Sequence, residues 1–319
     1  MFFLHLRMML LVTLLFAIVY AAMVAVGTYM GIGNFYIYLL IAFGFMFIQY
    51  MVGPKLIEWS MRVRYIKREE NPSLYKIVED QAAKARIPMP RVCIAQMPIP
   101  NAFAFGRSIS DGRVCVTQGI MQLLDEDELK AVIGHELSHI KNRDVLTITL
   151  LSVIPIIMYR LAWHLLFFGG GRRDRGQAAL IGLVALVFYF ITNLLVLYAS
   201  RIREYFADRG SIALGNKPSS LATALYKLVY GSARMGKGVI KEAEGFKAFF
   251  LNDPSQAMNE IRDLAQIDLD RSGTIDSYEL ANLRNKKVVL NLGDRMMEAM
   301  STHPNMLKRI QALAQQQKS

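Results

Sequence analysis

Charged residues are missing from a long stretch near the N-terminus. Residues 8–54 contain no Asp, Glu, Lys or Arg. A helix crosses a bilayer core with roughly 20 apolar residues, so this stretch can hold two such helices, with a break near GTYMGIGNF. A cleaved signal peptide is the alternative, but the second apolar segment follows at once, without a clear small-residue cleavage site. The sequence therefore predicts a retained transmembrane hairpin over residues 1–54, which argues against an ordinary soluble protein.

Cysteine is also scarce, and no nucleic-acid-binding motif is found. The two cysteines, Cys93 and Cys115, lie in β-like runs, so we expect buried thiols in a reducing compartment and no disulfide. The net charge of +11 is attributed to positive residues that face anionic lipid, and DNA and RNA are not expected partners.

Two further apolar segments, residues 145–168 and 178–199, predict a second membrane hairpin over residues 145–199. Pro155, Arg160 and His164 weaken the first of them as a full span. Positive residues follow the second N-terminal helix in KLIEWSMRVRYIKREE, and the positive-inside rule places them in the cytoplasm. Two full crossings would place the positive RRDR loop near residue 173 outside, against this rule. Either segments three and four span the bilayer and the rule is overridden there, or they only dip into it.

The polar remainder predicts an α+β domain that is mainly helical with a small sheet. RVCIAQM and RVCVTQG alternate like short strands, and PSLYKIVEDQAAKARI before them is typical of a helix. LLDEDELKAVIGHELSHI then predicts a helix in which Asp125 is the N-cap and Glu128 completes a capping box.

The segment HELSH matches the pattern H-E-x-x-H at His135, Glu136 and His139. Residues i and i+4 share one face of a helix, so both imidazoles can bind one metal ion. Zinc lowers the pKa of its bound water towards about 7, and the neighbouring Glu136 carboxylate can then take a proton from that water as general base.

A catalytic zinc needs a third protein ligand, which SRIREYFADRG is predicted to supply. This segment ends the fourth apolar segment, and HELSH precedes the third. Helices joined by a short turn run antiparallel, so the two ends are expected to be neighbours. Glu204 is assigned as the third ligand, and Asp208, one turn later, as the acceptor of a histidine N–H.

HELSH, SRIREYFAD, NAFAFG and STHP resemble the motifs of the HtpX-type integral-membrane zinc metallopeptidases, which are relatives of the CAAX prenyl endopeptidase. The resemblance covers nearly the whole chain. It implies a gluzincin (zincin-like) fold on up to four transmembrane helices. It also implies endoproteolysis of membrane or misfolded proteins, a stress-response task, at the cytoplasmic face of a bacterial or archaeal inner (plasma) membrane. A scaffold or calcium sensor that has lost hydrolysis is the alternative.

Two further roles are expected by analogy with zincins. NAFAFG is the expected edge strand on which a substrate backbone pairs, through Asn101, Ala102, Phe103, Ala104 and Phe105. His303 in STHPNMLKRI is the expected second electrophile for the oxyanion, with Arg309 in reserve. A purely structural role for His303 is equally compatible with the sequence.

A second metal motif, DLDRSGTIDSYE, covers residues 268–279 and fits an EF-hand calcium loop. The predicted calcium ligands are Asp268, Asp270, Ser272, Thr274 through its carbonyl, Asp276 through water and Glu279. Gly273 stands where the loop turns sharply. Predicted helices flank the loop, so residues 257–294 form an EF-hand-like insert in a peptidase domain of residues 55–144, 200–256 and 295–319.

Only one EF-hand is visible in the sequence, although EF-hands usually pair through the eighth loop residue. Ile275 at that position is expected either to pair with a second copy of the chain, giving a homodimer, or to pack on the peptidase domain. We also expect calcium to modulate the peptidase by ordering this insert next to STHP.

Overall fold

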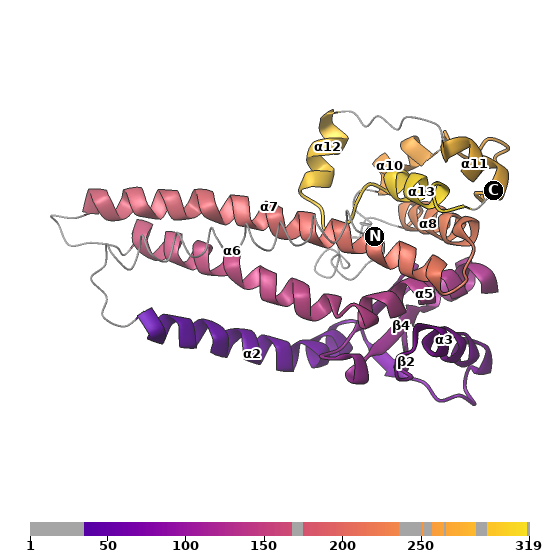
Figure 1. Cartoon of the computed structure of the whole chain (residues 1–319), viewed down its shortest axis with the longest axis horizontal. Coiled ribbons are helices and arrows are strands. Elements are labelled where there is room, and N and C mark those ends of the chain that lie inside the picture. Colours follow the sequence, from indigo (N-terminus) through magenta and orange to yellow (C-terminus); the bar gives the residue numbers. More distant parts are fainter. Residues whose placement is uncertain are drawn as a thin grey trace. The chain divides into compact units, whose positions relative to one another are not determined.

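The computed structural model describes residues 35–167, 175–235, 251, 257–264, 266–284 and 292–317 (Figure 1). The chain divides into two compact units, Met1–Val52 with Leu146–Ile202 and Gly53–Val145 with Arg203–Ser319. The first predicted membrane helix and residues 168–174, which hold all of the RRDR loop but its last arginine, lie outside the described residues. The mainly helical α+β architecture predicted from the sequence is confirmed.

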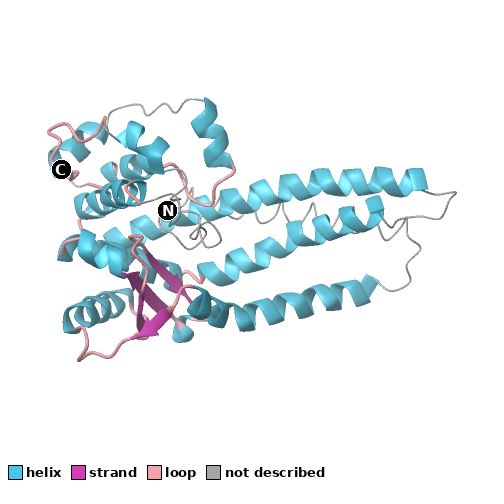
Figure 2. Ribbon diagram, turned by 180° about the vertical axis from the view of Figure 1, so that it is seen from behind, coloured by secondary structure: helices cyan, strands magenta, loops and turns pink. Residues whose placement is uncertain are grey.

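The described part of the first unit consists of long apolar helices. It holds most of α2 (Phe35–Ser60), α6 (Asp144–Phe167) and α7 (Arg175–Ala213), and α6 and α7 run side by side in Figures 1 and 2. Leu151 and Ile154 of α6 pack with Val196 and Ala199 of α7.

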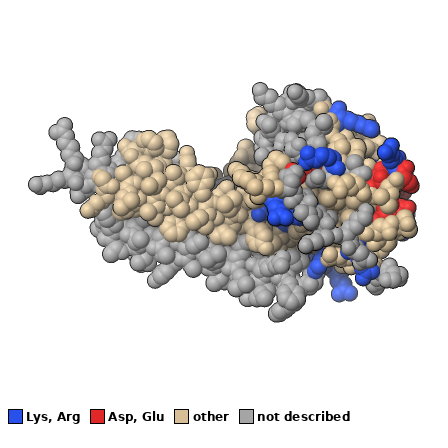
Figure 3. All heavy atoms as spheres, turned by 90° about the horizontal axis from the view of Figure 1, so that it is seen from above, with Lys and Arg blue, Asp and Glu red and all other residues tan. Residues whose placement is uncertain are grey.

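One helix among the described residues, Gly176–Ala213, is long and apolar enough to cross a membrane. Its apolar part contains the fourth segment predicted from the sequence, and no charged side chain interrupts residues 176–200. In Figure 3 this part of α7 belongs to the elongated tan surface, which shows no Lys, Arg, Asp or Glu. Large apolar side chains such as Leu180 and Phe190 are exposed along it, as expected for a helix that faces lipid.

The second unit contains a four-stranded sheet in the order β1-β2-β4-β3, drawn in magenta in Figure 2. Its strands are β1 (Val63–Tyr65), β2 (Arg91–Ala95), β3 (Ala102–Phe105) and β4 (Arg113–Thr117). β2 and β4 are parallel, whereas β1 and β3 are antiparallel to their neighbours. β3 is therefore an edge strand.

The central strands bring the two cysteines opposite each other. Cys93 of β2 is the register partner of Cys115 of β4, and both are buried free thiols. They fill the smaller core of this unit together with Met61, Ile99 and Phe103.

Helices complete the second unit: α3 (Pro72–Ala85), α4 (Gln118–Leu123), α5 (Glu126–Lys141), α8 (Pro218–Ala233), α10 (Ala257–Leu264), α11 (Ser277–Arg284), α12 (Leu292–Ala299) and α13 (Met306–Ala314), besides a short 3-10 turn, Ile109–Asp111. Asp125 caps α5 through the capping box with Glu128 that the sequence indicates.

The segment expected to form a separate insert shares the main core. Leu264, Ile275 and Leu280 are buried in the same apolar cluster as Leu221 of α8 and Ile310 of α13. The helices flanking the loop are only 8 residues each, too short to bury a core of their own, so their apolar faces pack on the peptidase helices.

Candidate metal centre and active site

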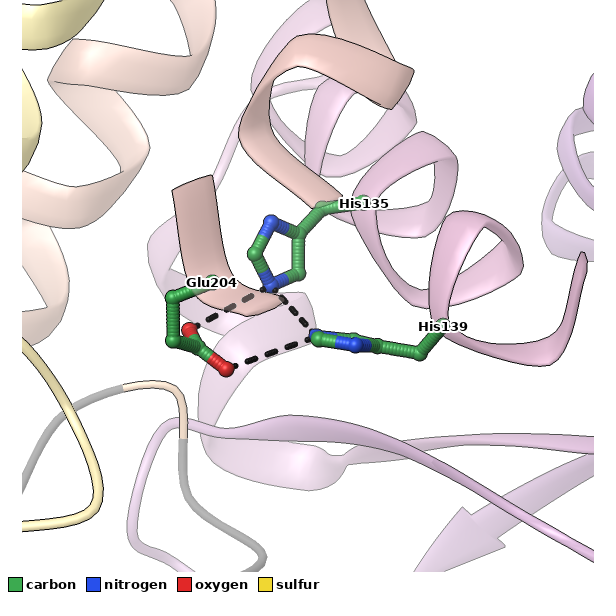
Figure 4. Close-up of side chains that lie close together, drawn as sticks. All are labelled: His135, His139 and Glu204. Carbon is green, nitrogen blue, oxygen red and sulfur yellow. Dashed lines mark hydrogen bonds and ion pairs between the residues drawn. The ribbon is translucent and has the colours of Figure 1, made fainter. Parts of the chain in front are cut away.

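The HELSH segment lies on α5, and its two histidines meet Glu204 of α7 (Figure 4). The Nε2 atoms of His135 and His139 are 3.0 Å apart. The Glu204 carboxylate lies 3.6 Å from His135 Nε2 through one oxygen and 3.5 Å from His139 Nε2 through the other. Three donor groups from two helices thus converge on one point.

This donor set fits zinc. Ligand atoms 2.0–2.1 Å from a tetrahedral zinc ion stand about 3.4 Å from one another, close to the separations found here. His135 is fully buried and Glu204 is 6% exposed; Glu204 Oε2 forms an ion pair with Arg309 Nη1 at 3.0 Å but no well-directed hydrogen bond within the described residues. A bound cation would coordinate this buried carboxylate and the two adjacent imidazole nitrogens, and would supply the directed partner that Glu204 Oε2 lacks.

Carboxylates on the far sides of both rings orient the histidines. Nδ1 of His135 lies 2.9 Å from Asp208, and Nδ1 of His139 lies 2.6 Å from Asp144. Each carboxylate favours a proton on Nδ1, which leaves the Nε2 lone pair directed at the metal position. Burial lowers the pKa of His135 despite Asp208, so this ring is neutral, as a metal ligand must be.

Two arginines hold these carboxylates. Arg309 of α13 is fully buried; its Nε and Nη2 donate to Asp208 at 3.0 and 2.7 Å, and its Nη1 lies 3.0 Å from Glu204. Arg203 pairs with Asp144 and also donates to the carbonyl of Asn142 at 2.9 Å. Asp144 and the structural role of Arg309 were not found from the sequence, because nothing in the local pattern marks either contact.

Close helix packing makes the convergence possible. A Cβ atom on Gly134 of α5 would lie 3.0 Å from Ser211 Oγ, and one on Gly210 of α7 would lie 2.6 Å from Ser138 Cβ. Any larger residue would therefore separate α5 from this end of α7. Ser211 donates to the carbonyl of Ala131 at 2.6 Å and fixes the approach.

Glu136 points towards the sheet. It is 3% exposed, and the backbone N–H of Ala104 in β3 donates to its carboxylate. Burial raises the pKa of this carboxyl to about 8 in the metal-free chain; the electrostatic interaction with His139 acts against this shift and the Glu204 charge adds to it. Glu136 is thus adjacent in space to the edge strand.

The structure places the expected substrate strand, β3, at the edge of the sheet, but it uses the backbone groups of Asn101 inside the chain. Asn101 donates its N–H to Thr117 Oγ1, and its carbonyl accepts from the Thr117 N–H, both at 2.9 Å. Its side chain accepts from Leu251 at 2.9 Å. Asn101 is therefore used inside the chain and cannot offer backbone groups to a substrate. In an antiparallel ladder these directions alternate, so Ala102 and Ala104 direct their backbone groups away from β4.

His303 lies beside the metal centre. Its Nδ1 is 3.4 Å from Glu204 Oε2, the ring is 9% exposed, and neither ring nitrogen forms a well-directed hydrogen bond within the described residues. A buried ring whose nitrogens lack well-directed hydrogen bonds can bond a molecule that enters the metal centre.

The predicted calcium loop lies between α10 and α11. Carboxylate oxygens of Asp268, Asp270 and Glu279 lie within 4.8 Å of one another. The loop turns at Gly273, which has φ of +79°. The remaining predicted ligands are close by: Ser272 Oγ lies 2.9 Å from Thr274 Oγ1, and Asp276 accepts from the Glu279 N–H at 2.8 Å.

Comparison with known proteins gives the family. Residues 68–317 match the model of peptidase family M48. A Protease HtpX homolog of Methanothermobacter thermautotrophicus is 50% identical over 226 residues, covering 71% of this chain and 86% of that protein. A Protease HtpX homolog of Thermoplasma acidophilum is 31% identical over 307 residues, covering 93% of this chain and 91% of that protein.

A solved structure has a similar fold. The crystal structure of S. mikatae Ste24p aligns with a TM-score of 0.52 at 14% identity, over 98% of this chain and 67% of that one. At this identity the likeness shows the fold alone. The family match and the HtpX relatives carry the assignment: this chain belongs to peptidase family M48 and is an HtpX-type zinc metallopeptidase with the H-E-x-x-H motif.

Proposed function

We propose that this zinc peptidase is an integral-membrane endopeptidase that cleaves membrane or misfolded proteins at the cytoplasmic face of a bacterial or archaeal inner membrane. The observation that carries the proposal is the convergence of His135, His139 and Glu204, because the third ligand belongs to the same helix as the apolar stretch of α7. Positive residues that follow the apolar part of α2 support a cytoplasmic catalytic unit; they include Lys55, Arg64 and Lys67.

His135, His139 and Glu204 would hold the ion, with Asp208 and Asp144 fixing the imidazoles. Bound zinc would supply a Lewis acid that polarises the scissile carbonyl and makes a water more acidic. Glu136 would accept the proton of the attacking water on its carboxylate and pass it to the leaving amine. Its burial keeps bulk water from competing for that proton.

The substrate backbone would pair with the outer edge of β3. Ala102 has both backbone groups on that side and Ala104 has its carbonyl there, while the Ala104 N–H bonds Glu136. A peptide added here as a further strand would run beside the proposed base. Phe103 and Phe105 form part of the buried core, so they support the strand from below.

His303 would donate to the oxyanion that forms on the scissile carbonyl. Its buried ring nitrogens near Glu204 support this role over a cap on α13, whose N-cap is Asn305. Arg309, the reserve candidate, is less suited, since Asp208, Glu204 and the carbonyl of Leu251 already occupy its donors.

Casein hydrolysis by the purified, zinc-loaded full chain tests the enzyme. The Glu136→Gln variant should bind zinc like the wild type but lose activity by at least about 100-fold. Glu204→Ala should lose zinc, whereas Glu279→Ala should keep it. Equal hydrolysis by the wild type and Glu136→Gln would favour the alternative, a scaffold or calcium sensor that retains the fold.

The loop at residues 268–279 would bind calcium as a single EF-hand. Six predicted ligands in the expected order, around a glycine in the left-handed conformation, support this beyond the acidic cluster alone. α11 contacts α13, whose N-terminal side carries STHP, so calcium would order this region and raise the peptidase rate. If calcium binds but the peptidase rate stays constant from micromolar to millimolar calcium, the ion has a purely structural role.

A homodimer through the EF-hand is disfavoured by the surroundings of Ile275. This residue is fully buried, and Thr223 of the same chain binds both its backbone groups. Of the two alternatives from the sequence, we therefore favour packing on the peptidase domain.

A further inference from the structure

The single EF-hand loop is docked on helix α8. The hydroxyl of Thr223 accepts from the N–H of Ile275 at 3.0 Å and donates to the carbonyl of the same residue at 3.0 Å. A hydroxyl can do both at once, because it has one proton and two lone pairs. Ile275 is fully buried, so without this hydroxyl two backbone groups would be left without water or a partner.

These two backbone groups are the ones that a second EF-hand normally satisfies. In paired EF-hands, the eighth residues of the two loops join through their backbones in a short antiparallel bridge. A side-chain hydroxyl here reproduces both bonds of that bridge. The eighth residue also stands between Thr274 and Asp276, two of the proposed ligands, so fixing it restricts the directions of both.

A second contact from α8 reaches a ligand itself. The hydroxyl of Tyr226, one turn after Thr223, donates to Asp268 Oδ2 at 2.7 Å. The N–H groups of Ser272 and Gly273 donate to the two oxygens of the same carboxylate at 3.0 Å each. The Tyr226 hydroxyl thus sets the orientation of the first loop ligand, which is 7% exposed.

We propose that α8 takes the place of the missing partner EF-hand, with Thr223 and Tyr226 as positioning residues that set the calcium affinity of the loop. This inference rests on the calcium part of the proposed function. It goes beyond that function because it assigns the part of the missing partner EF-hand to α8, a helix of the peptidase domain. The loop is already held in its docked form, so less conformational entropy is lost when the ion binds.

The same helix also holds the start of the zinc helix. Nζ of Lys227 lies 2.7 and 2.8 Å from the two carboxylate oxygens of Glu128. Glu128 is the residue that completes the capping box of α5. α8 therefore contacts the calcium loop through Thr223 and Tyr226 and the zinc helix through the next residue. A change in how the loop docks would act on the N-terminus of the helix that carries His135 and His139.

Calorimetric titration of CaCl2 into the zinc-loaded full chain in detergent tests the inference. Thr223→Val keeps the shape but removes both bonds to Ile275, and we expect calcium affinity to fall on the order of tenfold. Thr223→Ser restores the hydroxyl and should bind within about twofold of the wild type. Tyr226→Phe should weaken binding several-fold. Tyr75→Phe on α3, a matched Tyr-to-Phe change away from the loop, should leave it unchanged.

The outcomes separate the inference from the function on which it rests. Wild-type affinity in both Thr223→Val and Tyr226→Phe, with Glu279→Gln unable to bind, overturns the role of α8 and leaves the calcium site intact. If the wild type binds no calcium, or Glu279→Gln binds as tightly as the wild type, the calcium site itself fails and the inference with it. Casein hydrolysis measured beside Glu136→Gln reports the zinc function independently. Zinc content and circular dichroism identify any variant that has misfolded. If Thr223→Val has misfolded, the calcium affinity of Tyr226→Phe alone decides whether α8 sets the affinity of the loop.

Discussion

His139 and Asp144 form the link between the metal centre and the start of α6: Nδ1 of the histidine lies 2.6 Å from the carboxylate. Arg203, one residue before the third ligand, pairs with the other oxygen of Asp144. The carboxylate therefore orients one zinc ligand and is itself held by the segment that supplies another. His135 and Asp208 repeat the arrangement with Arg309 as the counter-ion.

The Asp144→Asn variant should bind zinc about 10–100-fold more weakly than the wild type. The amide has nearly the same shape but lacks the charge that favours the Nδ1 proton of His139 and attracts Arg203. Competition with a chelator of known affinity measures the change. Asp127→Asn, on the exposed side of α5, is the matched control and should behave as wild type. Equal zinc affinity in the two variants would show that Asp144 has no orienting role.

The parts of the site that depend on local periodicity or on simple topology could be predicted from the sequence. The i, i+4 spacing is enough to place His135 and His139 on one face of a helix. Glu204 followed from the order of the apolar segments, since the end of the fourth had to return to the start of the third. The capping box of α5 is equally local, because Asp125 and Glu128 are three residues apart.

Other contacts could not be predicted, because they depend on how separate helices approach. Arg309 is 101 residues from Asp208, and Thr223 is 52 residues from Ile275. An arginine in KRIQ or a threonine in LATAL carries no mark of a buried partner. The contacts of Asn101 could not be predicted for the same reason: its pattern fits an edge strand, but Thr117 takes its backbone groups.

Replacing Arg309 by Met should lower the free energy of unfolding of the metal-free protein by roughly 3–5 kcal/mol, because two buried carboxylates lose their counter-ion. Lys308→Met is the control. Its ion pair with Glu298 lies nearer the surface, where such pairs contribute about 0–1 kcal/mol. Denaturant titration in detergent measures both, and similar losses in the two variants would contradict a special role for Arg309. Zinc should recover part of the loss in Arg309→Met, since the cation offsets the charge of Glu204.

The stability of the sheet should depend on pH through Asp111. Partial burial raises the pKa of this carboxyl, but hydrogen bonds and charge from Arg107 and Arg113 outweigh it and hold the pKa below its usual range. Arg91 adds an ion pair at 2.6 Å. A group with a lowered folded-state pKa contributes its full stability above the unfolded value, about 3.9, and loses it as pH falls towards the folded value.

Thermal unfolding of the metal-free wild type and Asp111→Asn measures this dependence. The variant should melt at a lower temperature at pH 6, and the two curves should converge as pH falls below about 4. Metal-free protein is used because zinc release at low pH would otherwise dominate the comparison. A difference that stays constant from pH 6 to pH 3 would mean that the charge of Asp111 does not stabilise the fold.

Gly210→Ala should weaken the zinc site without touching a ligand. Its new methyl group would lie 2.6 Å from Ser138 Cβ, far inside van der Waals contact, so α7 must move away from α5 and carry Glu204 with it. Overpacking of this kind costs about 1–3 kcal/mol, and we expect a loss of zinc affinity of about tenfold or more. Gly176→Ala on the same helix, with nothing within 4 Å, should have no such effect. Adding Ser138→Gly to Gly210→Ala removes the clashing atom, so zinc affinity should recover; a double variant as defective as the single one would show that helix separation is not the cause.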